Sequence, residues 1–114
     1  MSKQGWLVKQ GGSWKSWKHR WFVIDGHILI YYKDQLKIKK MGEIDLSLAF
    51  SITPNDNVKV KHFSNIFSIR TPSRVYNISA STPREREEWV EELLNSKNGI
   101  QKSIIPQNTE KTNI

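Results

Sequence analysis

Residues 9–20 read Lys-Gln-Gly-Gly-Ser-Trp-Lys-Ser-Trp-Lys-His-Arg. The chain enters this stretch through Gln4–Gln10, which alternates around apolar residues, and leaves it through Lys18–Asp25, which is rich in aromatic and β-branched residues. Both segments therefore predict strands. The Gly-Gly pair between them predicts a flexible loop, because glycine adopts backbone conformations that other residues avoid. The stretch is expected to join two antiparallel strands and to bring the basic residues at their ends together.

A meander of antiparallel strands is expected to continue from this hairpin. Asp25-Gly26 is typical of a tight turn, since both residues accept the positive φ that such turns require. A third strand is predicted at Ile28–Lys33, followed by a lysine-rich connection at 34–41. Further strands are predicted at Gly42–Leu46, Leu48–Thr53, Asn65–Thr71 and Arg74–Ala80, with Val58–Lys61 as an additional edge-strand candidate. The count reaches about seven strands by this pattern of alternation.

The hydrophobic period changes from two to that of a helix after residue 81. Thr82 suits an N-cap, Pro83 the first helical position and Glu85 the third. Asn98-Gly99 offers a stop signal. Between these ends the sequence carries an apolar stripe at helical spacing, made of Trp89, Val90, Leu93 and Leu94. One amphipathic helix is therefore expected to close the domain.

The composition favours one domain with an anionic partner. The 114 residues suit a single domain, which we place at 3–99, and the polar residues 100–114 are interpreted as a flexible tail or interdomain linker. The formal charge is +7, with the basic residues concentrated in the N-terminal half. No cysteine and no apolar run of membrane-spanning length are present, so a cytoplasmic protein with only peripheral membrane contact is expected.

Strand alternation predicts that several cations converge on one point. Residues two apart on a strand share a face, so Lys9 lies on the face of Leu7, Lys18 and Arg20 lie on the face of Phe22, and Tyr31 lies on that of Leu29. If the apolar members face the core, the polar ones line its mouth at the end that carries the first loop. Arginine, lysine and tyrosine together supply the donors that a cluster of phosphate groups would need.

The same residues give the chain a clear family resemblance. Gly5-Trp6-Leu7-x-Lys9, Lys15-x-Trp17-Lys18-x-Arg20-Trp21-Phe22, Tyr31-Tyr32-Lys33 and the helix with Trp89 resemble, in order and spacing, a pleckstrin homology (PH) domain over residues 3–97. The resemblance implies a mostly β fold with one C-terminal α-helix, namely a seven-stranded antiparallel, partly open barrel of two near-orthogonal sheets capped by the helix. It also implies that Trp89 packs into the core. We expect Trp6, Trp17 and Trp21 to pack against the barrel.

The resemblance also implies a ligand. PH domains that bind 3-phosphorylated inositol lipids carry a basic motif whose positions are occupied here by Lys9, Lys18, Arg20 and Tyr31. Further candidates by the same resemblance are Lys15, Lys40 and Arg70, with Trp14 as the membrane contact at the loop tip. Alternation argues against Arg70, since it points away from the core if its neighbours Phe67 and Ile69 point inward.

The predicted function is that of a phosphoinositide-binding module, expected to be monomeric, that recruits a signalling protein to the plasma membrane. The layout resembles the N-terminal targeting module of a protein kinase B-like protein, so the parent chain is a candidate kinase. The chain itself is not expected to be an enzyme, and no cofactor or metal is predicted, because the histidines lack metal-ligand spacing. Two alternatives stay open: a protein-binding adaptor of the same fold with weak anionic-lipid binding, and, with less support, a nucleic-acid binder.

Overall fold

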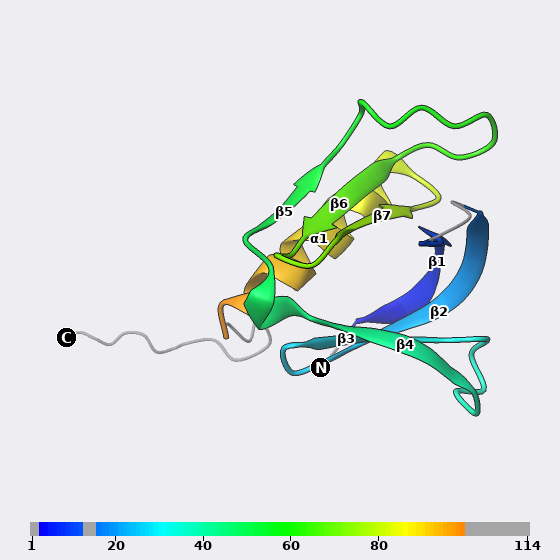
Figure 1. The fold of residues 1–114 in the computed structure, drawn as a ribbon. Helices are drawn as coiled ribbons and strands as arrows, with labels where there is room; N and C mark the ends of the chain where they lie inside the picture. Colours follow the sequence, from blue (N-terminus) through cyan, green and yellow to red (C-terminus); the bar gives the residue numbers. More distant parts are fainter. Residues whose placement is uncertain (1–2, 13–15, 100–114) are drawn as a thin grey trace.

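The computed structural model describes residues 3–12 and 16–99 (Figure 1). Within them the chain forms seven strands, a short 3₁₀ helix and one C-terminal α-helix. The elements are β1 (Gln4–Gln10), β2 (Trp17–Asp25), β3 (Ile28–Tyr32), β4 (Lys40–Asp45), η1 (Leu46–Leu48), β5 (Ser51–Pro54), β6 (Ile66–Arg70), β7 (Val75–Ser79) and α1 (Pro83–Lys97). No cis peptide bond occurs in the described ranges.

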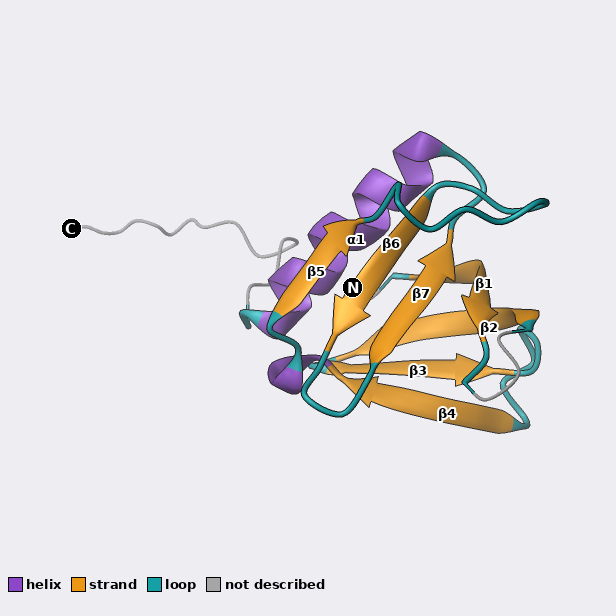
Figure 2. Cartoon of the chain, turned by 45° about the horizontal axis from the view of Figure 1, so that its top comes forward, coloured by secondary structure: helices purple, strands orange, loops and turns teal. Residues whose placement is uncertain are grey.

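All seven strands join one antiparallel sheet in the order β4-β3-β2-β1-β7-β6-β5. The two edge strands, β4 and β5, are not paired with each other, so the barrel is unclosed. Figure 2 shows β5, β6 and β7 running at a steep angle to β2, β3 and β4, with α1 lying along the β5 and β6 side. The predicted partly open barrel, capped by the helix, is confirmed.

Strand alternation places the core as the sequence predicts. Leu7, Phe22, Ile24 and Leu29 are all buried in one cluster, to which α1 contributes Trp89 and Leu93. Burying a large aromatic or branched side chain of this kind stabilises a fold by about 1.5–3 kcal/mol each. The polar residues at the ends of the same strands consequently lie next to this packed core.

The start and end of α1 also agree with the sequence. The Thr82 hydroxyl accepts a hydrogen bond from the Glu85 amide at 3.0 Å, and Pro83 takes the first helical position. At the other end Asn98 is the C-cap and Gly99 adopts a positive φ of 75°. The two ends of the helix are therefore determined by local capping signals.

One predicted strand begins too early and one edge-strand candidate is wrong. The strand predicted at Leu48–Thr53 is present as β5 but begins only at Ser51. The Asp45 carboxylate accepts hydrogen bonds from the Ser47 amide (3.0 Å) and hydroxyl (2.6 Å) and so stabilises the tight turn of η1 before it. The candidate edge strand Val58–Lys61 lies in an irregular connection between β5 and β6. The polar residues of this connection favour turns, and the alternating pattern at Val58–Lys61 is too short to produce a strand.

The tryptophans of β1 and β2 lie on the outer face of the barrel. Since Leu7 and Phe22 point inward, Trp6 and Trp21 must point outward, where their rings meet edge to face at 5.5 Å between centroids. Trp6 remains 43% exposed. Trp17 stacks on Phe63 of the β5–β6 connection, with centroids 5.6 Å apart. Trp89, unlike these three tryptophans, is buried in the core, as the resemblance implies.

Candidate anion-binding site

Lys9 ends the inward face of β1 and is almost buried, with 8% of its surface exposed. Its position between β2 and β7 places the ammonium group 4.9 Å from the centre of the Tyr31 ring and 5.8 Å from that of Tyr76. The ammonium also donates to the Gln10 carbonyl oxygen at 3.3 Å. The charge is thus held by two aromatic faces and one backbone oxygen, with little water.

Two arginines share this volume with Lys9. Burial first, then the charges of Arg74 and Arg20, lower the pKa of Lys9 to about 8. The Arg74 guanidinium lies 4.3 Å from the centre of the Tyr76 ring. Burial and repulsion between like charges both disfavour the ammonium form of Lys9.

Lys18 and Arg20 enter the site from β2. Lys18 is directly opposite Lys9 in the β1–β2 register and is exposed. Arg20 is half-buried, and its guanidinium donates to the His19 carbonyl oxygen at 2.9 Å. We refer to Lys9, Lys18, Arg20 and Arg74 as the cation cluster. In the part of the chain that the structure describes, no ion pair joins a carboxylate to any of them.

Tyr31 forms the aromatic floor beside Lys9. Its ring packs against Phe22, with centroids 5.3 Å apart, and lies over Gly42 of β4. A Cβ at Gly42 would overlap the Tyr31 hydroxyl and ring, so any larger residue at this position would force the tyrosine side chain to shift. Burial first, then the neighbouring Tyr76, raise the pKa of the Tyr31 hydroxyl, which therefore stays neutral.

Arg70 and Lys40, two of the remaining candidates, do not join the cation cluster. Arg70 lies on the outer face and donates to hydroxyl oxygens of β5, at 3.0 Å for Thr53 and 3.4 Å for Ser51. Lys40 pairs with Glu43, whose hydrogen bond raises the lysine pKa. Lys15 and Trp14 lie outside the described residues.

Arg74 and Tyr76 were missed by the sequence analysis although the signal was present. Arg74, Tyr76 and Ile78 are spaced two apart, and Ile78 is fully buried. Alternation along β7 therefore assigns Arg74 and Tyr76 to the inward face, as the same rule did for the first three strands.

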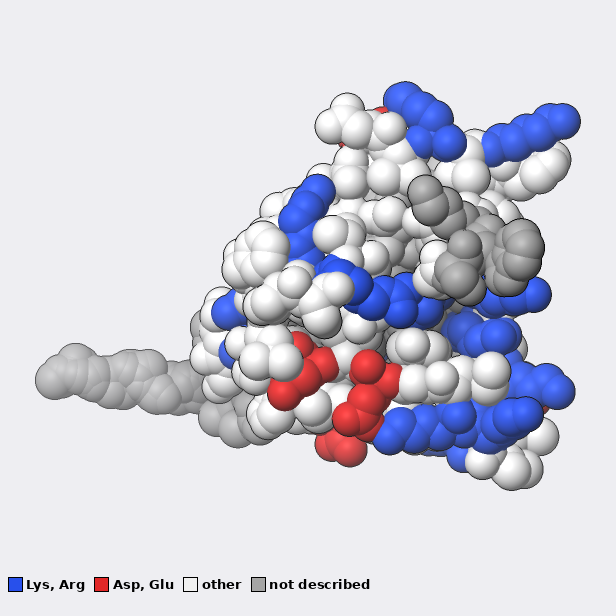
Figure 3. Space-filling view, in the orientation of Figure 1, with Lys and Arg blue, Asp and Glu red and all other residues white. Residues whose placement is uncertain are grey.

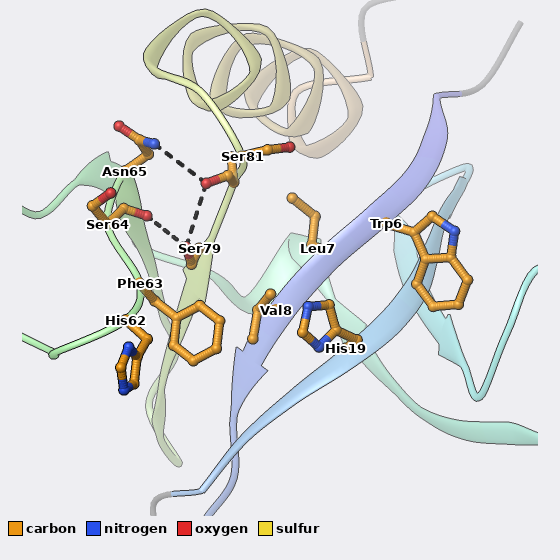
Figure 4. A pocket seen from close by; sticks show the side chains of 11 residues that line it. Trp6, Leu7, Val8, His19, His62, Phe63, Ser64, Asn65, Ser79 and Ser81 are labelled. Carbon is orange, nitrogen blue, oxygen red and sulfur yellow. Dashed lines mark hydrogen bonds between the residues drawn. The ribbon is translucent and has the colours of Figure 1, made fainter.

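A cavity of about 250 Å³ lies elsewhere, on the outer face of β1 (Figure 4). Its lining combines outward residues of β1 and β2, such as Val8 and His19, with Phe63 and Ser64 of the β5–β6 connection. No member of the cation cluster lines it. Among residues 3–12 and 16–99, no group of acidic residues, histidines and cysteines could hold a metal ion.

Positive charge dominates one side of the barrel. Figure 3 shows lysine and arginine side chains gathered over the region where β3 and β4 meet their connecting loop and the nearby end of β2. None of the helices in the described ranges has the length and apolar character needed to cross a bilayer.

Comparisons with known proteins agree with this architecture. The PH domain family model matches residues 1–98. The RAC family serine/threonine-protein kinase homolog of Dictyostelium discoideum is 39% identical over 94 residues, 82% of this chain and 20% of that protein. The mouse (Mus musculus) dual adapter for phosphotyrosine and 3-phosphotyrosine and 3-phosphoinositide is 33% identical over 92 residues, 81% of this chain and 32% of that protein.

Among solved structures, the C-terminal PH domain of pleckstrin in complex with D-myo-Ins(1,2,3,4,5)P5 aligns with a TM-score of 0.69. The two sequences are 32% identical, and the alignment covers 84% of this chain and 98% of that one. This chain spans at most a third of the length of the two curated relatives named above. The similarity is therefore to one module of those proteins.

Proposed function

Because this chain belongs to the PH domain family, we propose that its cation cluster binds the headgroup of a 3-phosphorylated inositol lipid and so recruits a signalling protein to the plasma membrane. Family membership agrees with the expectation that the chain is a binding module and not an enzyme. Its signalling-protein relatives include an adapter whose name contains 3-phosphoinositide and a pleckstrin domain solved with an inositol pentakisphosphate. These relatives support an inositol phosphate as the ligand class.

The observation that carries the proposal is the buried, uncompensated ammonium of Lys9. Its pKa is lowered to about 8 by burial and by two arginines, and no described carboxylate pairs with it. A phosphate group placed here would replace repulsion by charge-assisted hydrogen bonds, each worth about 1.5–3 kcal/mol. Lys18, at the exposed rim, would add a mobile contact.

We assign supporting roles to the neighbouring residues. Tyr31 holds Lys9 in place through its ring and supplies a neutral hydroxyl near the ligand. Lys15 would add a phosphate contact and Trp14 a membrane contact, in keeping with the amphipathic character of tryptophan at bilayer interfaces. We propose that the module covers residues 3–99, acts as a monomer in the cytoplasm and is followed by a linker at 100–114. A kinase domain in the parent chain is a proposal supported by the Dictyostelium relative.

A titration of inositol phosphates against the isolated domain tests the proposal. Arg20→Ala and Arg74→Ala should each weaken binding by roughly 10- to 150-fold, because each removes a charge-assisted contact of about 1.5–3 kcal/mol. Arg70→Ala is the matched control, since Arg70 lies on the outer face and should leave affinity unchanged. Equal effects of all three changes would refute the location of the site, and no measurable binding by the unaltered domain would refute the function.

A protein-binding adaptor is the second candidate, favoured by the exposed Trp6 beside the outer-face cavity. Tryptophan is enriched among the residues that dominate protein interfaces. Cosedimentation with vesicles separates the two functions: the lipid proposal requires binding that depends on a few per cent of phosphoinositide. Binding that needs only bulk anionic lipid, or that soluble oligonucleotide matches, would contradict specific headgroup recognition.

A further inference from the structure

The connection between β3 and β4 exposes two aliphatic side chains. Leu36 is 69% exposed and Ile38 is 84% exposed. A single exposed apolar residue is ordinary on a protein surface, whereas two on one short turn form a small apolar tip. Basic residues flank and separate them, at Lys33, Lys37 and Lys39.

This tip is built by specific backbone contacts. The Lys33 amide donates to the Lys39 carbonyl oxygen at 3.0 Å and closes the connection. Within it, the Leu36 amide donates to the Asp34 carboxylate at 3.0 Å and the Lys37 amide donates to the Asp34 carbonyl oxygen at 3.1 Å. Lys37 adopts a positive φ of 58°, a conformation that side chains other than glycine rarely take. The turn thus holds Leu36 and Ile38 outward in a defined geometry.

The tip lies at the same end of the barrel as the cation cluster. Tyr31, which lines the site, is followed by Tyr32 and then the turn, and Tyr32 is paired with both Trp21 of β2 and Lys40 of β4. Arg20 adjoins Trp21 on β2, so the turn begins beside the part of β2 that carries the cluster residues. Figure 1 shows this connection projecting past β3 and β4, and Figure 3 shows basic side chains in the same region.

We propose that Leu36 and Ile38 insert into the interfacial region of an anionic bilayer while Lys33, Lys37 and Lys39 contact lipid phosphates. The inference deepens the proposed function, since it assigns this tip as a second membrane contact beside the headgroup site. A bilayer surface has anionic headgroups outside and acyl chains beneath them. The lysines can contact the headgroups while the apolar side chains between them reach the acyl chains. The charge complementarity selects an anionic lipid surface over a purely apolar partner.

The test compares two pairs of exposed apolar residues. The double variant Leu36→Ala/Ile38→Ala removes the tip. The control Leu48→Ala/Phe50→Ala removes residues that are 61% and 68% exposed but lie after the opposite end of β4. Binding is measured by flotation with phosphatidylcholine–phosphatidylserine vesicles containing a 3-phosphoinositide, and by titration with a soluble inositol phosphate. Insertion is measured as the rise in surface pressure of a phosphatidylserine monolayer without phosphoinositide.

The double variant should lose vesicle affinity by about tenfold or more, because transfer of two aliphatic side chains from water is lost. Its soluble inositol phosphate affinity should match the unaltered domain, and the control should behave like the unaltered domain in every assay. Vesicle binding unaffected by the double change would overturn the inference, as expected if a protein covers the tip. An equal loss of soluble inositol phosphate binding would also overturn it, since the turn would then only support the headgroup site.

The monolayer separates failure of this inference from failure of the proposed function. If the unaltered domain binds no inositol phosphate, the proposed function fails. The insertion proposal still stands if the unaltered domain raises the monolayer pressure and the double variant does not. A monolayer pressure that the unaltered domain leaves unchanged would overturn insertion.

Discussion

Raising the pH from about 7 to about 9 should weaken inositol phosphate binding roughly tenfold through the titration of one residue, Lys9. The pKa of Lys9 in the free domain is about 8, lowered first by burial and then by Arg74 and Arg20. In the proposed complex the ammonium form contacts phosphate. A phosphate group beside it favours that form and raises the Lys9 pKa in the complex.

The magnitude follows from the fraction of Lys9 that carries a proton. With a pKa of about 8, roughly nine-tenths of the free domain is protonated at pH 7 and roughly one-tenth at pH 9. If the bound lysine stays charged, the dissociation constant rises by the ratio of these fractions, about tenfold, and binding takes up one proton at the higher pH. Phosphate monoesters only gain negative charge over this range, which would tighten binding. A loss of affinity with rising pH therefore cannot come from ionisation of the phosphate groups, which would increase the affinity.

Isothermal titration calorimetry in buffers of different ionisation enthalpy measures both the affinity and the proton uptake. Lys9→Arg is the matched control, because a guanidinium keeps its charge throughout this range. Its affinity should be nearly independent of pH, and no proton should be taken up. Parallel pH profiles for the two proteins, or no proton uptake by the unaltered domain at pH 9, would refute the reasoning.

Two further predictions concern the support of the site. Trp89→Ala should lower the free energy of unfolding by about 3–5 kcal/mol in urea denaturation, since it empties a core position that is 3% exposed; a negligible change would contradict the docking of α1. Gly42→Ala should force the Tyr31 ring away from β4, lowering the free energy of unfolding by about 1–3 kcal/mol and weakening inositol phosphate binding. If Gly42→Ala changed neither the free energy of unfolding nor inositol phosphate affinity, the close approach of Tyr31 to β4 would not be needed for stability or binding.

The sequence predicted well those parts of the fold that local rules determine. Alternation predicted β1 to β3 because one face of each strand must be buried, and the Thr82 cap with Pro83 predicted where α1 begins. It failed between β4 and β5, where one carboxylate at Asp45 stabilises a turn that interrupts an otherwise strand-like pattern. Such side-chain-to-backbone bonds depend on three-dimensional geometry that hydrophobic alternation does not contain.

Strand alternation was enough to predict the residues that lie on the inward face of the barrel. It could not predict which lysines are already paired with a carboxylate. Lys9, Lys18, Arg20 and Tyr31 share the expected end of the barrel because each extends a buried apolar row. Lys40 could not be assigned from sequence in the same way. Its charge is engaged by Glu43, and a carboxylate three residues away competes with a ligand only if both side chains lie on the same side of the strand.

The two arginines around the β6–β7 turn show why alternation outweighs motif position. Arg70 ends β6 and is paired with Val75, which is 47% exposed, so both side chains lie on the outer face. Arg74 precedes Val75 by one residue and therefore lies on the opposite face, beside Tyr76 and Lys9. A shift of one residue along a strand exchanges the inside for the outside of the barrel. Of the two arginines, only Arg74 can therefore join the cluster, even where a related domain uses an arginine at the position of Arg70.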